Sequence, residues 1–238
     1  MKVIRVAATG IIDDAIQQTG YVPHDGSFGI TDADELAEAA GRLCYKSFQR
    51  PNPKTATNVG YLKNIINQEH FSVLEHASVT YYVSGVSRSL LTELERHRHF
   101  SLSVVSQRYV SHSDTYVNKN YVYPPVFQEL DAYQSMDLKR EVDELIVIID
   151  YVYGVIVNTL TEAGLSRKEI REAARSVLPQ AVTTEFFITG NLRAYREMLQ
   201  KRLSPGADKE IRYLAKELLQ DLKQYAPNTF QDLNEMDD

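Results

Sequence analysis

The chain has 238 residues and a mass of 27.1 kDa, enough for one large domain with its own hydrophobic core. Apolar residues make up 43% and charged residues 24%, close to ordinary soluble usage, which excludes disordered and fibrous classes. The 26 basic and 32 acidic side chains give a net charge of −6. The chain therefore lacks the cationic excess of a protein that coats nucleic-acid phosphates, and we expect no nucleic-acid partner.

The cysteine content and the N-terminus predict a cytoplasmic protein. Cys44 is the single cysteine, so neither an intramolecular disulfide nor a thiolate metal site can form, which fits a reducing compartment. Charges interrupt each apolar run near the N-terminus, so we expect no signal peptide and no membrane partner. The most apolar stretch, 145–160, contains Asp150 and Asn158 and is interpreted as a core helix.

Hydrophobic periodicity and breakers divide the first half of the chain into short elements. Asp32 or Asp34 can cap a helix that ends before Pro51. The expected order is a strand at 2–8, a loop at 10–31, helices from residue 32 and at 56–68, a strand at 77–84 and a helix at 87–98.

The second half of the chain is more helical. Gly164 closes one helix, and Ser166 with Glu169 forms a capping box for the next, which Pro179 ends. The expected order is a strand at 104–110, an exposed loop at 111–125, helices at 127–163 and 166–178, a strand at 183–189, helices at 191–203 and 207–225, and a frayed acidic tail at 231–238. No repeat or long linker divides the chain, so we expect a single α+β domain over 1–238.

The densest group of ligand-suited side chains is Arg96-His97-Arg98-His99, at the end of the helix expected at 87–98. Arginines two residues apart lie about 200° apart around a helix axis, so they would serve two different ligands. Ser106, Gln107 and Arg108 follow and add groups suited to phosphate capture. The alternative is a solvated basic helix end that complements the helix dipole and pairs with Glu93 and Glu95.

The run Arg96-His97-Arg98, seven residues and Ser106 resembles the RHRX7S signature of the flavin-dependent thymidylate synthases. The longer run through Tyr109 is similar to the actinobacterial branch of that family. Four further segments stand in family order and spacing, at 51–58, 70–77, 174–179 and 189–193. The resemblance covers 34–225 and implies an α+β fold with a mixed, mostly antiparallel sheet flanked by helices and a long helical C-terminal half.

The resemblance also implies a reaction and a set of ligands. A homotetramer would bind FAD between subunits, reduce it with NADPH, and transfer the carbon of methylene-tetrahydrofolate to C5 of dUMP. FAD would contact Ser72, Arg96, His97, Arg98, His99, Asn191, Leu192, Arg193 and Glu197. The nucleotide would contact Glu93, Arg96, Ser106, Gln107, Arg108, Arg175 and Arg202. Arg202 would be catalytic, because a fixed guanidinium stabilises the negative charge that develops on the uracil as the flavin hydride arrives.

Elementary chemistry agrees with several of these assignments. Asn191 opens a helix directly after a strand, where free backbone amides attract anions. Arg175 and Arg202 lie on expected helices, and burying them is costly unless an anion or carboxylate meets them. The alternative is local ion pairing, of Arg175 with Glu172 or Glu169 and of Arg202 with Glu197 or Glu210.

Other chemistries are less well supported. Cys44 lies on the apolar side of a helix and is interpreted as a buried structural cysteine, so thymidylate synthases with a catalytic cysteine are not the template. Ser106 lacks the surroundings of a nucleophile elbow. The histidine spacings match no zinc helix, so we expect no metal. The aromatic loop with Tyr116, Tyr121 and Tyr123 is interpreted as a packing flap or subunit contact.

The chain departs from the family pattern at a few positions: Glu95, Val104, Glu197 and Gly206. Members usually have Glu or Gln at the position of Val104, so we expect somewhat weaker nucleotide and flavin binding here. Two alternatives to the thymidylate synthase remain. One is a related C5-methylase of another uracil nucleotide such as UMP, and the other is a catalytically weak nucleotide-binding or RNA-binding homologue.

Overall fold

A computed structural model describes residues 1–23, 30–112 and 121–234. The chain divides into two compact units. Unit 1 comprises Met1–Lys2, Val83–Arg96 and Ser103–Phe186, and unit 2 comprises Val3–Tyr82, His97–Leu102 and Phe187–Asp238. The expected single domain over 1–238 stays a prediction.

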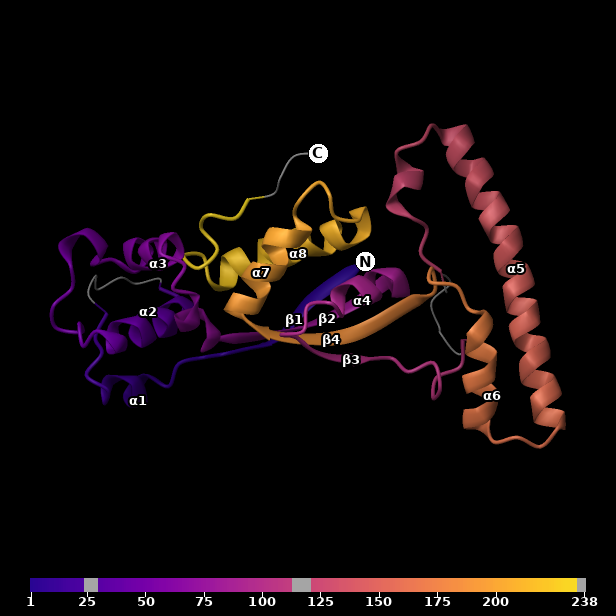
Figure 1. Ribbon diagram of the computed structural model, residues 1–238, viewed down its shortest axis with the longest axis horizontal. Coiled ribbons are helices and arrows are strands. Elements are labelled where there is room, and N and C mark those ends of the chain that lie inside the picture. The colour runs from indigo at the N-terminus through magenta and orange to yellow at the C-terminus, as the bar shows by residue number, and fades with distance from the viewer. Residues whose placement is uncertain (24–29, 113–120, 235–238) are drawn as a thin grey trace. The chain divides into compact units, whose positions relative to one another are not determined.

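One four-stranded sheet has the order β1 (Lys2–Ala8), β2 (Ser78–Ser87), β4 (Thr183–Asn191) and β3 (Ser101–Val104) (Figure 1). Its strands are antiparallel, and the predicted α+β class is confirmed. Three strands lie where the sequence predicts them. The strand expected at 104–110 is wrong, because the amides of Tyr109 and Val110 bond back to the carbonyl of Ser106 and form a turn there.

The helices of unit 2 come from the first and the last part of the chain. They are α1 (Asp13–Gln17), α2 (Asp32–Cys44), α3 (Asn58–Asn67), the 3-10 turn η2 (Phe71–Glu75), α7 (Leu192–Arg202) and α8 (Lys209–Tyr225). The predictions for α2, α3, α7 and α8 are confirmed, whereas α1 lies inside the stretch expected to be a loop. Tyr81 of β2 packs edge-on against Tyr195 of α7, with ring centroids 5.7 Å apart, and its hydroxyl donates to Asp221 of α8. These contacts seat α7 and α8 on β2.

Unit 1 holds α4 (Arg88–Leu94), η4 (Pro125–Gln128), α5 (Ala132–Glu162), α6 (Arg167–Ala174) and η5 (Arg175–Val177). The capping box of Ser166 and Glu169 is confirmed at the start of α6. Helix α4 ends four residues before the expected residue 98, because the amide of Glu95 caps it by bonding the carbonyls of Leu91 and Glu93. Residues 96–99 therefore lie in turns, and the argument from their angular separation on a helix does not hold.

Helix α5 exposes most of its apolar side chains, contrary to the expected core helix. Leu145, Ile148 and Tyr151 are 56%, 59% and 71% exposed. By length and composition α5 also qualifies as a membrane span, although these criteria alone are weak evidence. The helix is apolar as predicted, but no part of the chain that the structure describes covers these side chains.

The aromatic loop before α5 packs more closely than an exposed loop would. Tyr121 is buried, and its hydroxyl donates to Asp150 of α5 at 2.6 Å. Tyr123 donates to Asp143, also on α5. The packing role is therefore correct for these two tyrosines, whereas Tyr116 lies outside the described residues.

Candidate functional site

In unit 2, the turn that contains His97 and His99 is anchored on the end of β4 by Phe100. A Cβ atom at Gly190 would approach the Phe100 ring to 2.4 Å, so only glycine permits this contact. The Phe100 ring also lies 4.9 Å from that of Tyr195 in α7. Glycine at 190 thus brings the His97–His99 turn alongside α7.

The same turn meets the end of α7 through Arg202. The Nε atom of Arg202 donates to Nε2 of His97 at 2.9 Å. A guanidinium only donates, so this nitrogen of His97 accepts and its neutral ring carries the proton on Nδ1. The bond fixes the orientation of the half-buried Arg202 guanidinium.

A cavity of about 280 Å³, here called the Arg193 pocket, opens beside α7. Its lining residues are Glu75, His99, Asn191, Arg193, Ala194 and Glu197. Arg193 donates through Nη1 to Glu75 at 2.7 Å and through Nε to Glu197 at 3.0 Å. The hydrogen bond to Glu197 and, to a smaller extent, the one to Glu75 raise the pKa of Arg193. The pocket therefore presents a fixed cation between two carboxylates.

The N-terminus of α7 offers fewer free amides than the sequence suggests. The side chain of Asn191 accepts from the amide of Ala194 at 2.9 Å, and the amide of Leu192 donates to the carbonyl of Ala77 at 3.0 Å. The Leu192 side chain is fully buried. An anion at this end of α7 would therefore depend on side chains such as Arg193 rather than on the helix amides.

A second cavity of about 410 Å³, here called the Phe71 pocket, shares Arg193 with the first. Its lining residues are Gly41, Cys44, Tyr45, Ile65, Glu69, His70, Phe71, Ser72, Val73 and Arg193. Ser72 is thereby placed next to, but not in, the Arg193 pocket. Cys44 is exposed here, so the prediction of a buried cysteine is wrong: the side chain at the last residue of α2 lines this cavity, whereas Gly41 and Arg42 of the same turn are buried.

In unit 1, a small cavity is lined by Arg88, Val105, Gln107, Val110, Ser111, His112, Tyr153, Leu178, Val182, Thr183 and Thr184. Burial lowers the pKa of Arg88, the carboxylate of Glu95 partly offsets this, and the positive charge of Arg175 adds a smaller lowering. The hydroxyl of Thr184 is buried and has no hydrogen-bond partner among the described residues. One guanidinium, the amide of Gln107 and an unsatisfied hydroxyl in this lining suit an anion. Sequence reasoning missed Arg88, because a lone arginine at the start of a helix carries no motif.

The remaining predicted nucleotide residues also lie in unit 1. The Ser106 hydroxyl accepts from the amide of Arg108 at 3.4 Å, and the Arg108 guanidinium lies 5.6 Å from the ring centroid of Tyr109. The carbonyl of Glu93 accepts from the amide of Arg96. Val104 ends β3 and is half-buried, while its neighbour Val105 lines the cavity.

Three of the predicted arginines are available for ligands. Arg96, Arg98 and Arg175 are exposed, and no described residue forms an ion pair with any of them. The expected pairing of Arg175 with Glu172 or Glu169 is absent, since Glu169 instead bonds Ser166. Within the described ranges, no group of three or more histidine, cysteine or acidic residues gathers in metal-binding geometry.

The predicted residues thus divide between the two units. Unit 1 holds Glu93, Arg96, Ser106, Gln107, Arg108 and Arg175, and unit 2 holds Ser72, His97, Arg98, His99, Asn191, Leu192, Arg193, Glu197 and Arg202. Unit 1 supplies a small cavity with Arg88 and Gln107 in its lining, and unit 2 supplies two adjoining pockets with cationic, imidazole, amide and carboxylate groups.

Comparison with known proteins places this chemistry in context. A family model described as thymidylate synthase complementing protein matches residues 29–228. The chain is 48% identical to a probable flavin-dependent thymidylate synthase of Mycobacterium phage L5, over 98% of this chain and 97% of that protein. It is also 48% identical to the flavin-dependent thymidylate synthase of Mycobacterium tuberculosis H37Rv, over 85% and 81% of the two chains.

Solved structures show the same fold. Thymidylate synthase X from Helicobacter pylori, crystallised with FAD and dUMP, matches with a TM-score of 0.61 and 24% identity over 98% of each chain. A second crystal structure of that protein with the same two ligands gives a TM-score of 0.63 and 25% identity, covering 98% of this chain and 99% of the other.

Proposed function

Because the chain belongs to the family of flavin-dependent thymidylate synthases, we propose that it reductively methylates dUMP to dTMP. Methylene-tetrahydrofolate would donate the carbon, and NADPH would reduce the bound FAD. The observation that carries the proposal is the arrangement in unit 2: His99 and Arg193 line one cavity, and the bond from Arg202 to His97 joins the end of α7 to the turn that contains His99.

The groups around the Arg193 pocket fit FAD chemically. Its pyrophosphate requires cationic donors: Arg193 lines the pocket, and Arg98 is the chain neighbour of the lining residue His99. Its ribityl and ribose hydroxyls and adenine amine require acceptors, which Glu75 and Glu197 provide. Asn191 offers an amide group in the lining of the same pocket. Ser72, His97 and Leu192 lie outside this lining but in the same unit. Bound FAD, once reduced, supplies the hydride for the reaction.

The cavity of unit 1 would hold the nucleotide phosphate. Arg88 lines this cavity, where burial lowers its pKa, a cost that a bound dianionic phosphate would relieve, and Arg175 is an exposed cation of the same unit. Gln107 and the unsatisfied hydroxyl of Thr184 line the same cavity and can donate to phosphate or sugar oxygens. Glu93, Arg96, Ser106 and Arg108 lie in the same unit and would complete the nucleotide contacts.

Arg202 would stabilise the transition state. Its guanidinium is oriented by the bond to His97 before any ligand arrives, so little reorganisation is needed when negative charge develops on the uracil oxygens. Removing one such preorganised donor typically costs about 3 kcal/mol in the barrier, or roughly a hundredfold in rate.

The Phe71 pocket would hold the folate or the nicotinamide cofactor. Its walls include the rings of Phe71, Tyr45 and His70, which suit a flat heterocycle. Because Arg193 lines this pocket and the Arg193 pocket alike, two ligands bound there would be neighbours. Transfer of a chemical group or a hydride from one ligand to another requires that the two be held next to each other.

The proposed assembly is a homotetramer. The exposed apolar side chains of α5, among them Leu145, Ile148 and Tyr151, have no cover within the described part of the chain. Exposed apolar surface of this extent marks an interface, and we assign it to further copies of this chain rather than to lipid. A cytoplasmic location accords with such an assembly and stays a prediction.

The decisive experiment is formation of dTMP from dUMP, methylene-tetrahydrofolate and NADPH by the purified protein supplied with FAD. We expect dTMP in the complete mixture and none when any one component is omitted. In Arg202→Lys, which keeps the charge but loses the planar fork, we expect turnover to fall while FAD remains bound. A complete mixture that oxidises NADPH but leaves dUMP unchanged contradicts the proposal.

A further inference from the structure

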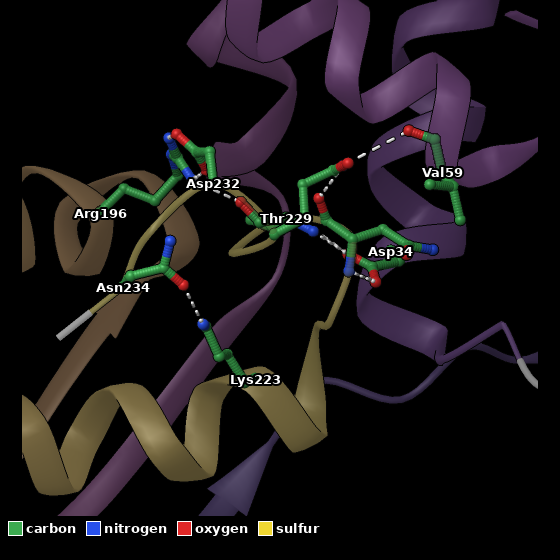
Figure 2. Close-up of polar contacts among 9 residues, drawn as sticks. Asp34, Val59, Arg196, Lys223, Thr229, Asp232 and Asn234 are labelled. Carbon is green, nitrogen blue, oxygen red and sulfur yellow. Dashed lines mark hydrogen bonds and ion pairs between the residues drawn. The ribbon is translucent and has the colours of Figure 1, made fainter.

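The segment that follows α8, residues 226–234 and here called the C-terminal strap, is held by a buried arginine of α7. The Arg196 side chain is only 2% exposed, and its Nη1 and Nη2 atoms donate to the two carboxylate oxygens of Asp232, each at 2.8 Å (Figure 2). Nη1 also donates to the carbonyl of Thr229 at 2.5 Å. This two-pronged contact fixes geometry as well as charge. It corrects the expectation of a frayed tail for residues 231–234, while 235–238 lie outside the described residues.

A second anchor ties the same strap to α2 and α3. The buried carboxylate of Asp34 accepts from the amides of Asn228 and Thr229, at 2.8 and 2.9 Å, and from the Thr229 hydroxyl at 2.6 Å (Figure 2). The side chain of Gln231 donates to the carbonyl of Val59 at 3.3 Å. The strap therefore joins the helices at the start of unit 2 to α7.

Arg196 also touches the elements that line the two pockets. On α7, Arg193, Arg196 and Glu197 fall within about 100° of the helix circumference. The Arg196 guanidinium lies 5.6 Å from the ring centroid of Phe71, the first residue of η2. Glu75, the last residue of η2, is the carboxylate that pairs with Arg193. Arg196 thus stands between the strap on one side and the pocket-lining elements α7 and η2 on the other.

We propose that Arg196 is a positioning residue: held by Asp232 and Thr229 of the strap, it sets the spacing of α7 and η2 that flavin binding requires. The inference rests on the proposed function. Asp232 is the only carboxylate among the described residues that pairs with Arg196, so its loss leaves a buried charge without a counterion. Relief of that charge requires α7 or η2 to move, and Arg193 and Glu75 move with them.

The test compares FAD dissociation constants of folded apoprotein, measured by quenching of flavin fluorescence. Asp232→Asn keeps the size of the side chain and removes its charge, and we expect FAD to bind about tenfold more weakly. Asp232→Glu keeps the carboxylate and is expected to restore affinity to within about threefold. Asn234→Ala removes the 3.2 Å contact with Lys223 farther along the strap and serves as the matched control with unchanged affinity.

A second readout needs no ligand. Amide hydrogen exchange in the apoprotein should rise in 192–202 and 71–75 of Asp232→Asn and stay unchanged in 167–174 of unit 1. A lower melting temperature with unchanged FAD affinity and unchanged exchange in these segments overturns the inference, because it shows a purely structural contact. If Asp232→Asn does not fold, Arg196→Lys, which keeps the charge and loses the two-pronged contact, takes its place with the same expectations. A wild-type chain that binds no FAD overturns the proposed function, whereas the exchange result still decides whether the strap positions α7.

Discussion

At the scale of single residues, the surroundings of each arginine decide what it can do. Arg193 bonds two carboxylates, Arg196 is buried in α7 and bonds Asp232 of the strap, and Arg202 is bonded to His97. Arg98 differs from these three because it is exposed and forms no ion pair with a described residue. A cation in that state is poised for an anionic ligand.

Arg98→Ala should therefore lose FAD. Charge-assisted hydrogen bonds to pyrophosphate contribute about 1.5–3 kcal/mol each, so we expect the dissociation constant to rise roughly 10- to 100-fold. The measurement is the flavin content of the protein after gel filtration. Arg50→Ala, a change at another exposed arginine that lines neither pocket of unit 2, is the control and should retain its flavin. Full retention of FAD by Arg98→Ala would remove this residue from the cofactor site.

At the scale of elements, one glycine determines how the His97–His99 turn meets α7. The contact between Phe100 and Gly190 leaves no room for a methyl group, and the two nearest ring atoms would lie at 2.4 and 2.5 Å from it. A flat ring cannot yield as a flexible chain end can, so the turn itself has to shift. The bond from Arg202 to His97 depends on that turn.

Gly190→Ala should disturb the site as well as the fold. Overpacking of this kind typically costs about 1–3 kcal/mol of stability, and we expect weaker FAD binding in the fraction that remains folded. Urea unfolding and flavin titration measure the two effects separately. Gly206→Ala is the matched control, because its added Cβ would meet nothing closer than 3.9 Å. Equal behaviour of the two variants would show that the Phe100 contact is dispensable.

The strap should also give a pH-dependent contribution to stability. Burial acts to raise the pKa of Asp232, but the hydrogen bonds and charge of Arg196 outweigh it and hold the pKa below the ordinary 3.8. A carboxyl whose folded pKa is depressed stabilises the fold above its unfolded pKa, and that stability is lost as the pH falls through the folded pKa. Burial raises the pKa of Asp34 more than its hydrogen bonds lower it. Ionisation of this carboxyl as the pH rises therefore lowers the stability of the fold.

The free energy of unfolding of wild type minus that of Asp232→Asn isolates the first effect, because Asp34 is present in both. We expect this difference to be largest above about pH 5 and to shrink as the pH falls through about 4 and below. Urea unfolding followed by far-UV circular dichroism at several pH values measures it. A difference that stays constant down to about pH 3 would show that Asp232 is not the group that titrates.

At the scale of the whole molecule, the apolar face of α5 is the feature that the described chain leaves uncovered. Ile148 lies on that face and is 59% exposed. Ile148→Glu should therefore dissociate the assembly, because burying an unpaired carboxylate at an interface is costly. Gln134→Glu adds the same charge in the exposed first turn of α5 and should leave the assembly intact. Light scattering after size exclusion, without detergent, gives the mass of each species, and a monomeric wild type would refute the tetramer.

The sequence by itself determines the local elements and the family. Periodicity, breakers and the capping box place most helices and strands, because each signal depends on neighbours a few residues apart. The spacing from Arg96 to Ser106 and four further segments identify the family, which the comparisons confirm. The boundaries near residues 96 and 104 are wrong because backbone bonds in the turns there outweigh side-chain propensity.

Only the tertiary structure decides which side chains meet. The contacts of Arg193 with Glu75, of Arg202 with His97 and of Phe100 with Gly190 join positions about 90 to 118 residues apart, and no local pattern encodes such distances. The same holds for the buried pair of Arg196 and Asp232 and for the exposure of Cys44. Hydrophobic periodicity shows that α5 has an apolar face, but whether that face is covered by its own chain or by another depends on how the whole chain packs.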